Sequence, residues 1–363
     1  MAKKTDETLS FIEQLKKDLK DDSIDISKLS DPSNDIIREP TGILALDNIC
    51  GGGFPKGRWI EIFGMESSGK SLLATLVCAH AQKKGDMVAW IDMERTADNK
   101  WFARLGVDTD KMLVIKPTSA EGAFKALNTL IDSGKISYIV LDSVASMATE
   151  KEIEEEPGKQ NMAVMARLLS TEMRKLTGKL DSTKTTVILI NQIRSAMAAT
   201  AYAKQNTTTG GKAIGFYASL RLWVKKLTDP STYIEDRNGE RLAHSISIRV
   251  EKNKVGSPGK TGSFMLIYDG GPDNRTAIIG MALQAGIITK NMAMYYLDVD
   301  GQSISARGER ALLEKIQQSP KIQKYLLSAL HIDPTYADTF ESDKRELAVA
   351  EGLATMVKLP EDE

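Results

Sequence analysis

The chain has 363 residues, of which 42% are hydrophobic and 27% are charged, and its formal net charge is −1. These values are typical of a globular protein with one large domain and smaller appendages, and no apolar run is long enough to cross a bilayer. Cys50 and Cys78 stand outside any paired motif, so we expect neither a disulfide framework nor a cysteine-rich zinc site. The N-terminus lacks the apolar stretch of a secretory signal, and we therefore expect a cytoplasmic protein.

Charge is distributed unevenly along the chain. Residues 194–226 carry basic side chains and no acidic ones: Arg194, Lys204, Lys212, Arg221, Lys225 and Lys226. In residues 333–363 the acidic side chains outnumber the basic ones, which are Lys344, Arg345 and Lys358. This asymmetry is typical of a region that binds a polyanion and of a tail that competes for the same surface, although ordinary solvated surfaces also carry such charges.

The first predicted element is an amphipathic helix over residues 5–20, in which leucine and isoleucine recur at helical spacing. A polar stretch that contains Pro32 and Pro40 follows it. We therefore predict that residues 1–40 form a helical arm outside the main body.

From Thr41 onward, short apolar runs alternate with helical segments. The runs are RWIEIF (58–63), MVAWIDME (87–94), MLVIK (112–116), YIVLDS (138–143) and TTVILINQ (185–192). Continuous apolar strands between helices predict an α/β fold with a largely parallel sheet that is covered on both faces. After Gly215, three further strand-like runs without long helices between them predict an antiparallel extension of that sheet.

These patterns divide the rest of the chain into three parts. We expect a core over residues 41–275, a small mixed domain over 276–332 and an acidic tail over 333–363. No internal repeat is apparent.

A phosphate-binding loop is the strongest signal in the sequence. Residues 64–71 read GMESSGKS, which fits GxxxxGK[ST], and they lie between a predicted strand and a predicted helix, as the motif requires. Backbone N–H groups and the helix N-terminus would surround phosphate oxygens, Lys70 would reach the β- and γ-phosphates, and Ser71 would ligate Mg²⁺. The predicted phosphate-binding residues are Gly64, Glu66, Ser67, Ser68, Gly69, Lys70, Ser71 and Leu72.

Two carboxylates follow predicted strands that end beside this loop. Asp142 ends YIVLD, the position of a carboxylate that holds the metal with Ser71, although an aspartate there also commonly caps the next helix. Glu94 lies two residues beyond Asp92, and a base that orients the attacking water is needed at this edge. We favour Glu94 as that base, and Asp92 could instead make local hydrogen bonds.

Several motifs occur together in a fixed order. They are GMESSGKS (64–71), WIDMER (90–95), VLDSVA (140–145), ILINQIR (188–194), TTTGGKAIGFYAS (207–219) and VEKNK (250–254). Their order and spacing resemble the RecA family of bacterial and phage DNA recombinases over roughly residues 41–290. The resemblance implies a RecA-like P-loop ATPase core, an N-terminal helical oligomerisation arm and a small C-terminal α+β domain.

The resemblance also implies roles for residues around the nucleotide. Glu94 matches the catalytic glutamate, in agreement with its position. Asp98 matches a carboxylate that contacts the base, and Trp101 matches an aromatic that stacks on adenine, with Trp in place of the usual Tyr; a buried core tryptophan is the alternative. Gln192 matches the residue that senses the γ-phosphate.

Other matched residues imply a subunit interface. Lys252 and Lys254 match a pair that reaches the ATP of a neighbouring subunit, where their charges would act as an arginine finger does. Tyr268 and Gly270 match residues that line the same nucleotide from the neighbour. Phe216 matches an aromatic that couples neighbouring subunits.

Two segments resemble the family's DNA-binding loops. The first covers about 153–163 and includes Met162, and the helix after it carries Arg167, Ser170 and Arg174 on one face. The second covers 194–211, and its predicted DNA-binding residues, with the lysine that follows, are Arg194, Met197, Gly210, Gly211 and Lys212. The methionines would wedge between bases, although adaptable packing is the plainer explanation of a loop methionine.

The resemblance implies an ATP-dependent protein of homologous recombination and DNA repair. It would form a helical filament on single-stranded DNA, search for homologous duplex, and exchange strands with DNA-stimulated ATP hydrolysis. The implied cofactors are ATP and Mg²⁺. The implied partners are single- and double-stranded DNA, further copies of the chain, and mediator or single-strand-binding proteins. No membrane is implied. The location would be a bacterial cytoplasm, whether the gene is bacterial or carried by a phage.

Two other functions share this core. One is a RecA-like ring ATPase or helicase, and the other is an ATP-gated scaffold that coats single-stranded DNA. The chain has no CxxC pair of the kind found in the extra domains of many ring ATPases, and the intact Lys70 and Glu94 argue against an inactive ATPase.

Overall fold

The computed structural model describes residues 2–20, 24, 26–155, 162–195, 206–227, 229, 232–236, 238–268 and 270–340. It divides into two compact units, Met1–Ile37 and Arg38–Glu363. The first unit contains α1 (Ala2–Leu19) and a 3₁₀ turn, η1 (Pro32–Asn34), whose N-cap Asp31 accepts a hydrogen bond from the backbone N–H of Ser33. The apolar side chains Leu9 and Phe11 of α1 are exposed.

The second unit is built on one large sheet. Within the described residues it has eleven strands, nine of them in the spatial order β13 (Gly271–Pro272), β12 (Thr261–Ile267), β11 (Arg241–Asn253), β9 (Leu220–Lys226), β3 (Trp59–Gly64), β7 (Thr186–Ser195), β6 (Ile136–Asp142), β4 (Met87–Asp92) and β5 (Met112–Ile115). The other two, β10 (Tyr233–Glu235) and β8 (Asn206–Thr208), pair with β11 and β7. A separate two-stranded sheet joins β1 (Arg38–Glu39) to β2 (Phe54–Pro55).

The strand directions confirm a mostly parallel sheet with an antiparallel extension. All pairings from β9 through β3, β7, β6 and β4 to β5 are parallel, and those among β9, β11, β12 and β13 are antiparallel. The extension therefore begins at β11, one strand later than the sequence pattern suggested. The strand over 220–226 joins β3 in parallel because β8 and α8 return the chain from the end of β7 before it enters β9.

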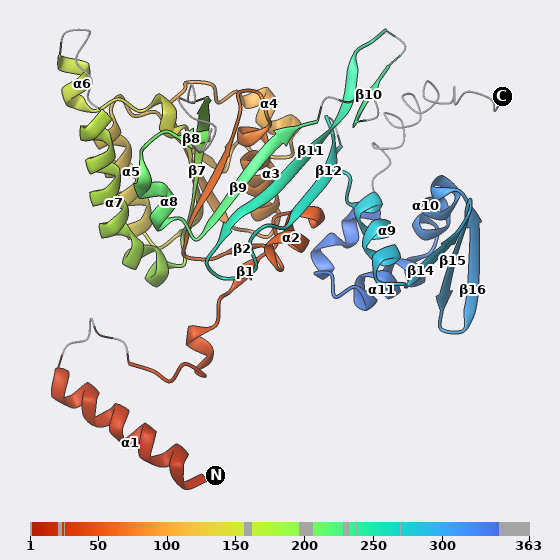
Figure 1. Ribbon diagram of the computed structural model, residues 1–363, viewed down its shortest axis with the longest axis horizontal. Coiled ribbons are helices and arrows are strands. Elements are labelled where there is room, and N and C mark those ends of the chain that lie inside the picture. The colour runs from red at the N-terminus through yellow and green to blue at the C-terminus, as the bar shows by residue number, and fades with distance from the viewer. Residues whose placement is uncertain are drawn as a thin grey trace, which may run out of the picture. The chain divides into compact units, whose positions relative to one another are not determined.

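Side-chain alternation along the strands explains why both faces are covered. Val88 and Trp90 of β4 point to one face, and Ala89 and Ile91 point to the other. The first face packs against α2 (Leu44–Cys50), α3 (Lys70–Lys83) and α4 (Asn99–Arg104). The second packs against α5 (Ala120–Asp132), α7 (Met162–Thr183) and α8 (Lys212–Tyr217), as Figure 1 shows; the short η2 (Val144–Ser146) and α6 (Glu150–Glu154) precede α7.

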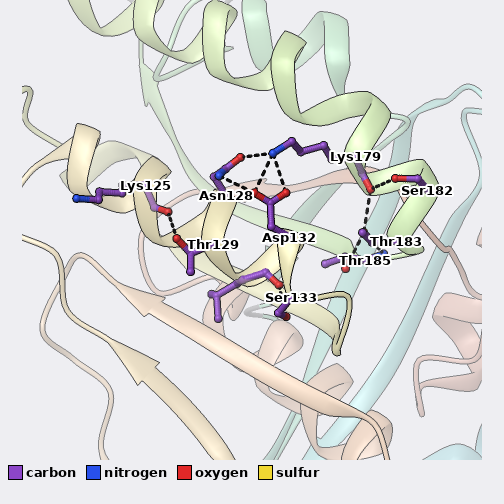
Figure 2. Close-up of polar contacts among 10 residues, drawn as sticks. Lys125, Asn128, Thr129, Asp132, Ser133, Lys179, Ser182, Thr183 and Thr185 are labelled. Atoms are coloured by element: carbon purple, nitrogen blue, oxygen red, sulfur yellow. Dashed lines mark hydrogen bonds and ion pairs between the residues drawn. The ribbon is translucent and has the colours of Figure 1, made fainter. Parts of the chain in front are cut away.

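Polar contacts fix α7 against α5 where the two helices end. Lys179 of α7 donates to Asn128 Oδ1 at 2.9 Å and pairs with Asp132 Oδ1 at 2.7 Å, and both acceptors belong to the last turns of α5 (Figure 2). Thr183 closes α7 by donating to the carbonyl oxygen of Lys179 at 2.8 Å. Because exposed ion pairs contribute little, the buried leucines of α7 supply most of the attachment.

The C-terminal part of this unit has a core of its own. It comprises α9 (Asn274–Gln284), the antiparallel strands β14 (Ile288–Asn291), β15 (Met294–Val299) and β16 (Gln302–Arg307), the helices α10 (Glu309–Gln317) and α11 (Pro320–Ala329), and the 3₁₀ segment η4 (Pro334–Phe340). Tyr336 and Phe340 are buried in it, so packed residues continue into the segment that the sequence assigned to the acidic tail.

A buried polar cluster connects this part to the core of the sheet. Asp47 of α2 accepts hydrogen bonds from the backbone N–H and the hydroxyl of Thr41 and from the hydroxyl of Tyr336. Burial raises the pKa of Asp47 to about 7 in spite of these donors. Asn274 reinforces the junction by accepting from the backbone N–H of Leu44 at 2.9 Å.

Cys50 and Cys78 are both buried with free thiols. Among the helices that the structure describes, none combines the length and the apolar character needed to span a membrane.

Replacing Tyr336 with Phe would leave the buried Asp47 without one donor. We expect the free energy of unfolding, measured by urea denaturation, to fall by about 1–3 kcal/mol. The matched control is Tyr296→Phe, because the Tyr296 side chain is 40% exposed on β15. Equal effects of the two substitutions would contradict the role of the buried hydrogen bond.

Candidate nucleotide and DNA site

The parallel strands bring the start of the phosphate loop and three polar side chains to one edge of the sheet. Gly64, at the end of β3, lies opposite Gln192 of β7, and Asp92, at the end of β4, lies opposite Asp142 of β6. Since parallel strands end at the same edge, residues distant in sequence meet there. The predicted phosphate loop, metal carboxylate and phosphate sensor are therefore neighbours.

The loop after β3 has the backbone of a phosphate cradle. Ser67 and Gly69 have φ values of +55° and +95°, which turn successive peptide groups inward, and α3 begins at Lys70. A side chain at Gly64 would come within 2.3 Å of the carbonyl oxygen of Val224, so only glycine fits. Lys70 is buried and donates to the carbonyl oxygen of Met65 at 2.7 Å.

Two buried oxygen atoms at this edge have no hydrogen-bond partner among the described residues. They are Ser68 Oγ in the loop and Asp142 Oδ1 at the end of β6. Unsatisfied buried polar atoms are costly unless a ligand completes them, so both fit a bound phosphate and its cation. No group of three or more His, Cys, Asp and Glu within the described ranges could hold a metal alone, and an ion at Ser71 and Asp142 would take its remaining ligands from water and phosphate, as Mg²⁺ does.

Burial shapes the charges of this edge. It raises the pKa of Asp142 to about 7, with further increases from Glu94 and Asp92 and an opposing effect from Ser71. It also lowers the pKa of Lys70, against the attraction of Asp142, Glu94 and Glu66. A cation would remove the cost of a charged Asp142.

Glu94 is held by two serines that follow β6. Its Oε1 accepts from the hydroxyls of Ser143 and Ser146, the latter at 3.0 Å, and its backbone N–H donates to the carbonyl oxygen of Asp142 at 3.3 Å. The neighbouring Asp92 accepts from the backbone N–H groups of Thr96 and Ala97. The sequence pattern does not single out the two serines, because a hydroxyl in the motif VLDSVAS carries no distinctive signal.

The residues matched to the base-binding positions lie on α4, which follows β4. Asp98 caps this helix by accepting from the backbone N–H of Trp101 at 2.8 Å. The Trp101 side chain is 37% exposed, so it is not a core tryptophan.

The residues matched to the subunit interface lie on the antiparallel side of the sheet. Lys252, near the end of β11, donates to the carbonyl oxygens of Gly215 and Phe216 at 2.7 and 3.0 Å. Lys254 lies just beyond that strand, and its Nζ is 5.4 Å from the centre of the Phe216 ring. Phe216 itself is 67% exposed on α8. Both lysines therefore lie beside α8. Their contacts with Gly215 and Phe216 place them there, and not a shared face of one strand.

Tyr268 and Gly270 follow β12, which is separated from β3 by β11 and β9. The Tyr268 ring packs edge-on against His244 with centroids 5.4 Å apart. These two positions are therefore not adjacent to the chain's own phosphate loop in the sheet.

The predicted DNA-binding residues of α7 share an exposed face. Arg167, Ser170 and Arg174 are exposed, while Leu169 and Leu176 on the same helix are buried. This division agrees with the helical spacing.

The second predicted loop returns to the sheet and then to α7. After β7 the chain comes back as β8, which pairs antiparallel with the end of β7. Gly210 and Gly211 follow with φ values of +93° and +68°, and a side chain on Gly210 would lie 2.6 Å from Leu169 Cδ1. The left-handed φ favours glycine at this position, and the close approach to α7 leaves little room for a side chain. Lys212 begins α8 and is exposed.

Some predicted positions fall outside the described residues. Met197 does so entirely, as does most of the first loop beyond residue 155. For Met162 and Arg194 the backbone belongs to α7 and β7, and the side chains lie outside the description.

Comparison with known proteins agrees with this architecture. A family model described as the RecA N-terminal domain matches residues 6–273. The protein named Protein RecA of Nocardioides sp. is 39% identical over 298 residues, which cover 82% of this chain and 83% of the relative. Protein RecA of Bifidobacterium breve is 38% identical over 320 residues, which cover 86% of this chain and 78% of the relative.

A solved structure titled as that of the RadB recombinase is similar at a TM-score of 0.48 and 20% identity, and the similarity covers 63% of this chain and 96% of that structure. The family model and the sequence relatives extend over most of the chain. The chain belongs to the RecA family.

Proposed function

We propose that this chain is an ATP-dependent DNA recombinase. It forms a helical filament on single-stranded DNA, pairs that strand with homologous duplex DNA, and hydrolyses ATP in response to DNA. Membership of the RecA family supports this proposal, and the site geometry supports the individual roles.

The observation that carries the proposal is the course of β7. Its residue Gln192 lies opposite Gly64 of the phosphate loop, and three residues further on, Ser195 pairs with Asn206 of β8. Most of the second predicted DNA loop lies between Ser195 and Asn206 in the sequence. A change at the nucleotide is therefore transmitted to the loop through a single strand, over three residues.

The hydrolytic roles follow from the positions at the sheet edge. Lys70 and the loop N–H groups bind the triphosphate of ATP, and Ser71 and Asp142 hold Mg²⁺, which when bound supplies positive charge against the phosphate oxygens. Glu94, oriented by Ser143 and Ser146, positions water and accepts its proton.

The subunit roles follow from exposure. Lys252 and Lys254 stand beside the exposed Phe216, and Lys252 pairs with Arg221 near the start of β9, whereas Gly64 of the phosphate loop pairs with Val224 towards its end. We assign them, with Tyr268 and Gly270, to the ATP of a neighbouring copy, and α1 with its exposed Leu9 and Phe11 to packing between copies.

The DNA roles follow from charge and position. Arg167, Ser170, Arg174 and Lys212 present donors on exposed surfaces of α7 and α8, and such groups bind the phosphate backbone irrespective of sequence. A recombinase needs no base-edge readout, because base pairing tests homology.

Electron microscopy with long single-stranded DNA and a non-hydrolysable ATP analogue tests the assembly. We expect continuous helical filaments. In a D-loop assay, these filaments should form joint molecules with homologous duplex DNA. Closed rings would instead indicate a ring ATPase. Filaments that never pair homologous duplex would indicate a coating scaffold.

Replacing Glu94 with Gln keeps the shape of the side chain and removes the base. We expect filament assembly to persist while the kcat of DNA-stimulated ATP hydrolysis falls by about 10²–10⁴-fold. Steady-state phosphate release measures this. Turnover at the level of the unmodified chain would refute the assignment of the base.

The raised pKa of Asp142 predicts pH-dependent metal binding. Below a pH of about 7 the free carboxyl is protonated, and a proton must leave before Mg²⁺ binds, so Mg²⁺-dependent nucleotide affinity should fall with decreasing pH, by up to about tenfold per pH unit. Calorimetric titrations at several pH values measure this. Asp142→Asn should weaken the affinity and abolish its dependence on pH near 7; an unchanged pH dependence would contradict the role of Asp142.

A further inference from the structure

A carboxylate lies in the middle of the most buried strand of the sheet. All six residues of β3 are buried, and Glu61 is 0% exposed between Ile60 and Ile62. A buried charge is costly unless it is paired and hydrogen-bonded on all sides. The two oxygens of Glu61 are satisfied from opposite directions, by one residue of β7 and one residue of β9.

The β7 partner is Asn191, which is also fully buried. Its Nδ2 donates to Glu61 Oε1 at 2.9 Å and to the carbonyl oxygen of Thr209 at 2.9 Å. Its Oδ1 accepts from the backbone N–H of Gln192 at 2.9 Å. One side chain thus ties Glu61 to the residue beside the phosphate loop and to the last residue before the pair Gly210–Gly211.

The β9 partner is Arg221, which lies directly opposite Glu61 in the parallel register. Its Nε pairs with Glu61 Oε2, and its guanidinium carbon lies 4.8 Å from the centre of the Phe63 ring. On the next strand, Lys252 lies opposite Arg221 and donates to two carbonyl oxygens of α8.

Glu61 also acts electrostatically on Lys252. Burial, Lys254 and Arg221 lower the pKa of Lys252 to about 8, and Glu61 opposes that decrease. The carboxylate therefore helps Lys252 to keep the charge that a neighbour's ATP would require.

We propose that Glu61 is a positioning residue that couples the nucleotide-sensing edge at Gln192 both to the second DNA loop at Thr209 and to Lys252 at the subunit interface. This inference rests on the proposed function. Glu61 itself touches neither nucleotide nor DNA. It acts through Asn191 on one side and Arg221 on the other, so that the position of Gln192, the end of the loop and the interface lysine are set together.

A carboxylate is required because both of its oxygens accept. In Glu61→Gln one oxygen becomes an NH₂ donor that faces either Asn191 Nδ2 or Arg221 Nε, which are donors as well. One of the two connections is then lost, and Arg221 loses its counter-charge. The residues that hold the phosphates remain unchanged.

We expect Glu61→Gln to keep its affinity for ATP without DNA within about twofold and to lose DNA-stimulated kcat on the order of 100-fold. A second readout is hydrogen exchange at residues 206–212. In the unmodified chain, adding a non-hydrolysable ATP analogue should change this exchange, and in Glu61→Gln it should not.

The matched control is Glu39→Gln. Glu39 of β1 is another buried carboxylate, 7% exposed. It pairs with Lys56 and Lys84 and has no contact with the sensing edge. We expect this variant to lose stability and yet to retain DNA stimulation and the nucleotide-dependent exchange. If Glu61→Gln fails to fold, Asn191→Ala, which leaves Glu61 and Arg221 paired, should uncouple Gln192 from residues 206–212 in the same assays.

Three outcomes separate the possibilities. Normal DNA stimulation in a folded Glu61→Gln variant overturns the proposal, and so does an equal loss of ATP affinity, which would make Glu61 part of the phosphate site. Absence of DNA-stimulated hydrolysis in the unmodified chain would instead overturn the proposed function. In that case the nucleotide-dependent hydrogen exchange at residues 206–212 still tests whether Glu61 couples Gln192 to these residues.

Discussion

The parallel pairing of β3 with β7 is the interaction on which the rest of the site depends. It places Gln192 opposite Gly64, and the parallel pairings of β7 with β6 and of β6 with β4 extend the same edge to Asp142 and Asp92. Backbone hydrogen bonds hold this register, and the buried polar pair specifies it, because a shift by one residue would turn Glu61 to the other face and away from Asn191. The polar groups of the nucleotide edge therefore take their positions from this run of parallel pairings.

The same pairing explains how the site can respond to a ligand. β7 is longer than β3, and its last residues leave the parallel sheet to pair with β8. One strand therefore belongs to the rigid core at one end and to the predicted DNA loop at the other. Buried polar side chains follow the same course: Glu61, Asn191 and Arg221 cross three adjacent strands. A fully satisfied buried network of this kind specifies one arrangement of its members, so displacement of one of them affects the others.

The C-terminal part is attached differently. Buried polar contacts at Asp47, Thr41, Tyr336 and Asn274 hold it against α2, and Leu44 of α2 packs into its apolar core. Because Asp47 is buried, the loss of any of these donors would leave an oxygen unsatisfied.

The sequence by itself predicted the elements and the residues of the proposed nucleotide edge. Loop motifs such as GMESSGKS and strand ends such as Asp142 and Glu94 are local, because phosphate binding by backbone N–H groups needs particular residues at fixed spacing. Helical spacing likewise predicted the exposed face of Arg167, Ser170 and Arg174. The tertiary structure decided what depends on contacts between distant segments: the parallel entry of β9, the packing of Gly210 against α7, the serines that hold Glu94, and the pairing of Glu61 with Asn191 and Arg221. A charged residue inside an apolar strand signals that a partner exists, but the register of the neighbouring strands alone decides which residue it is.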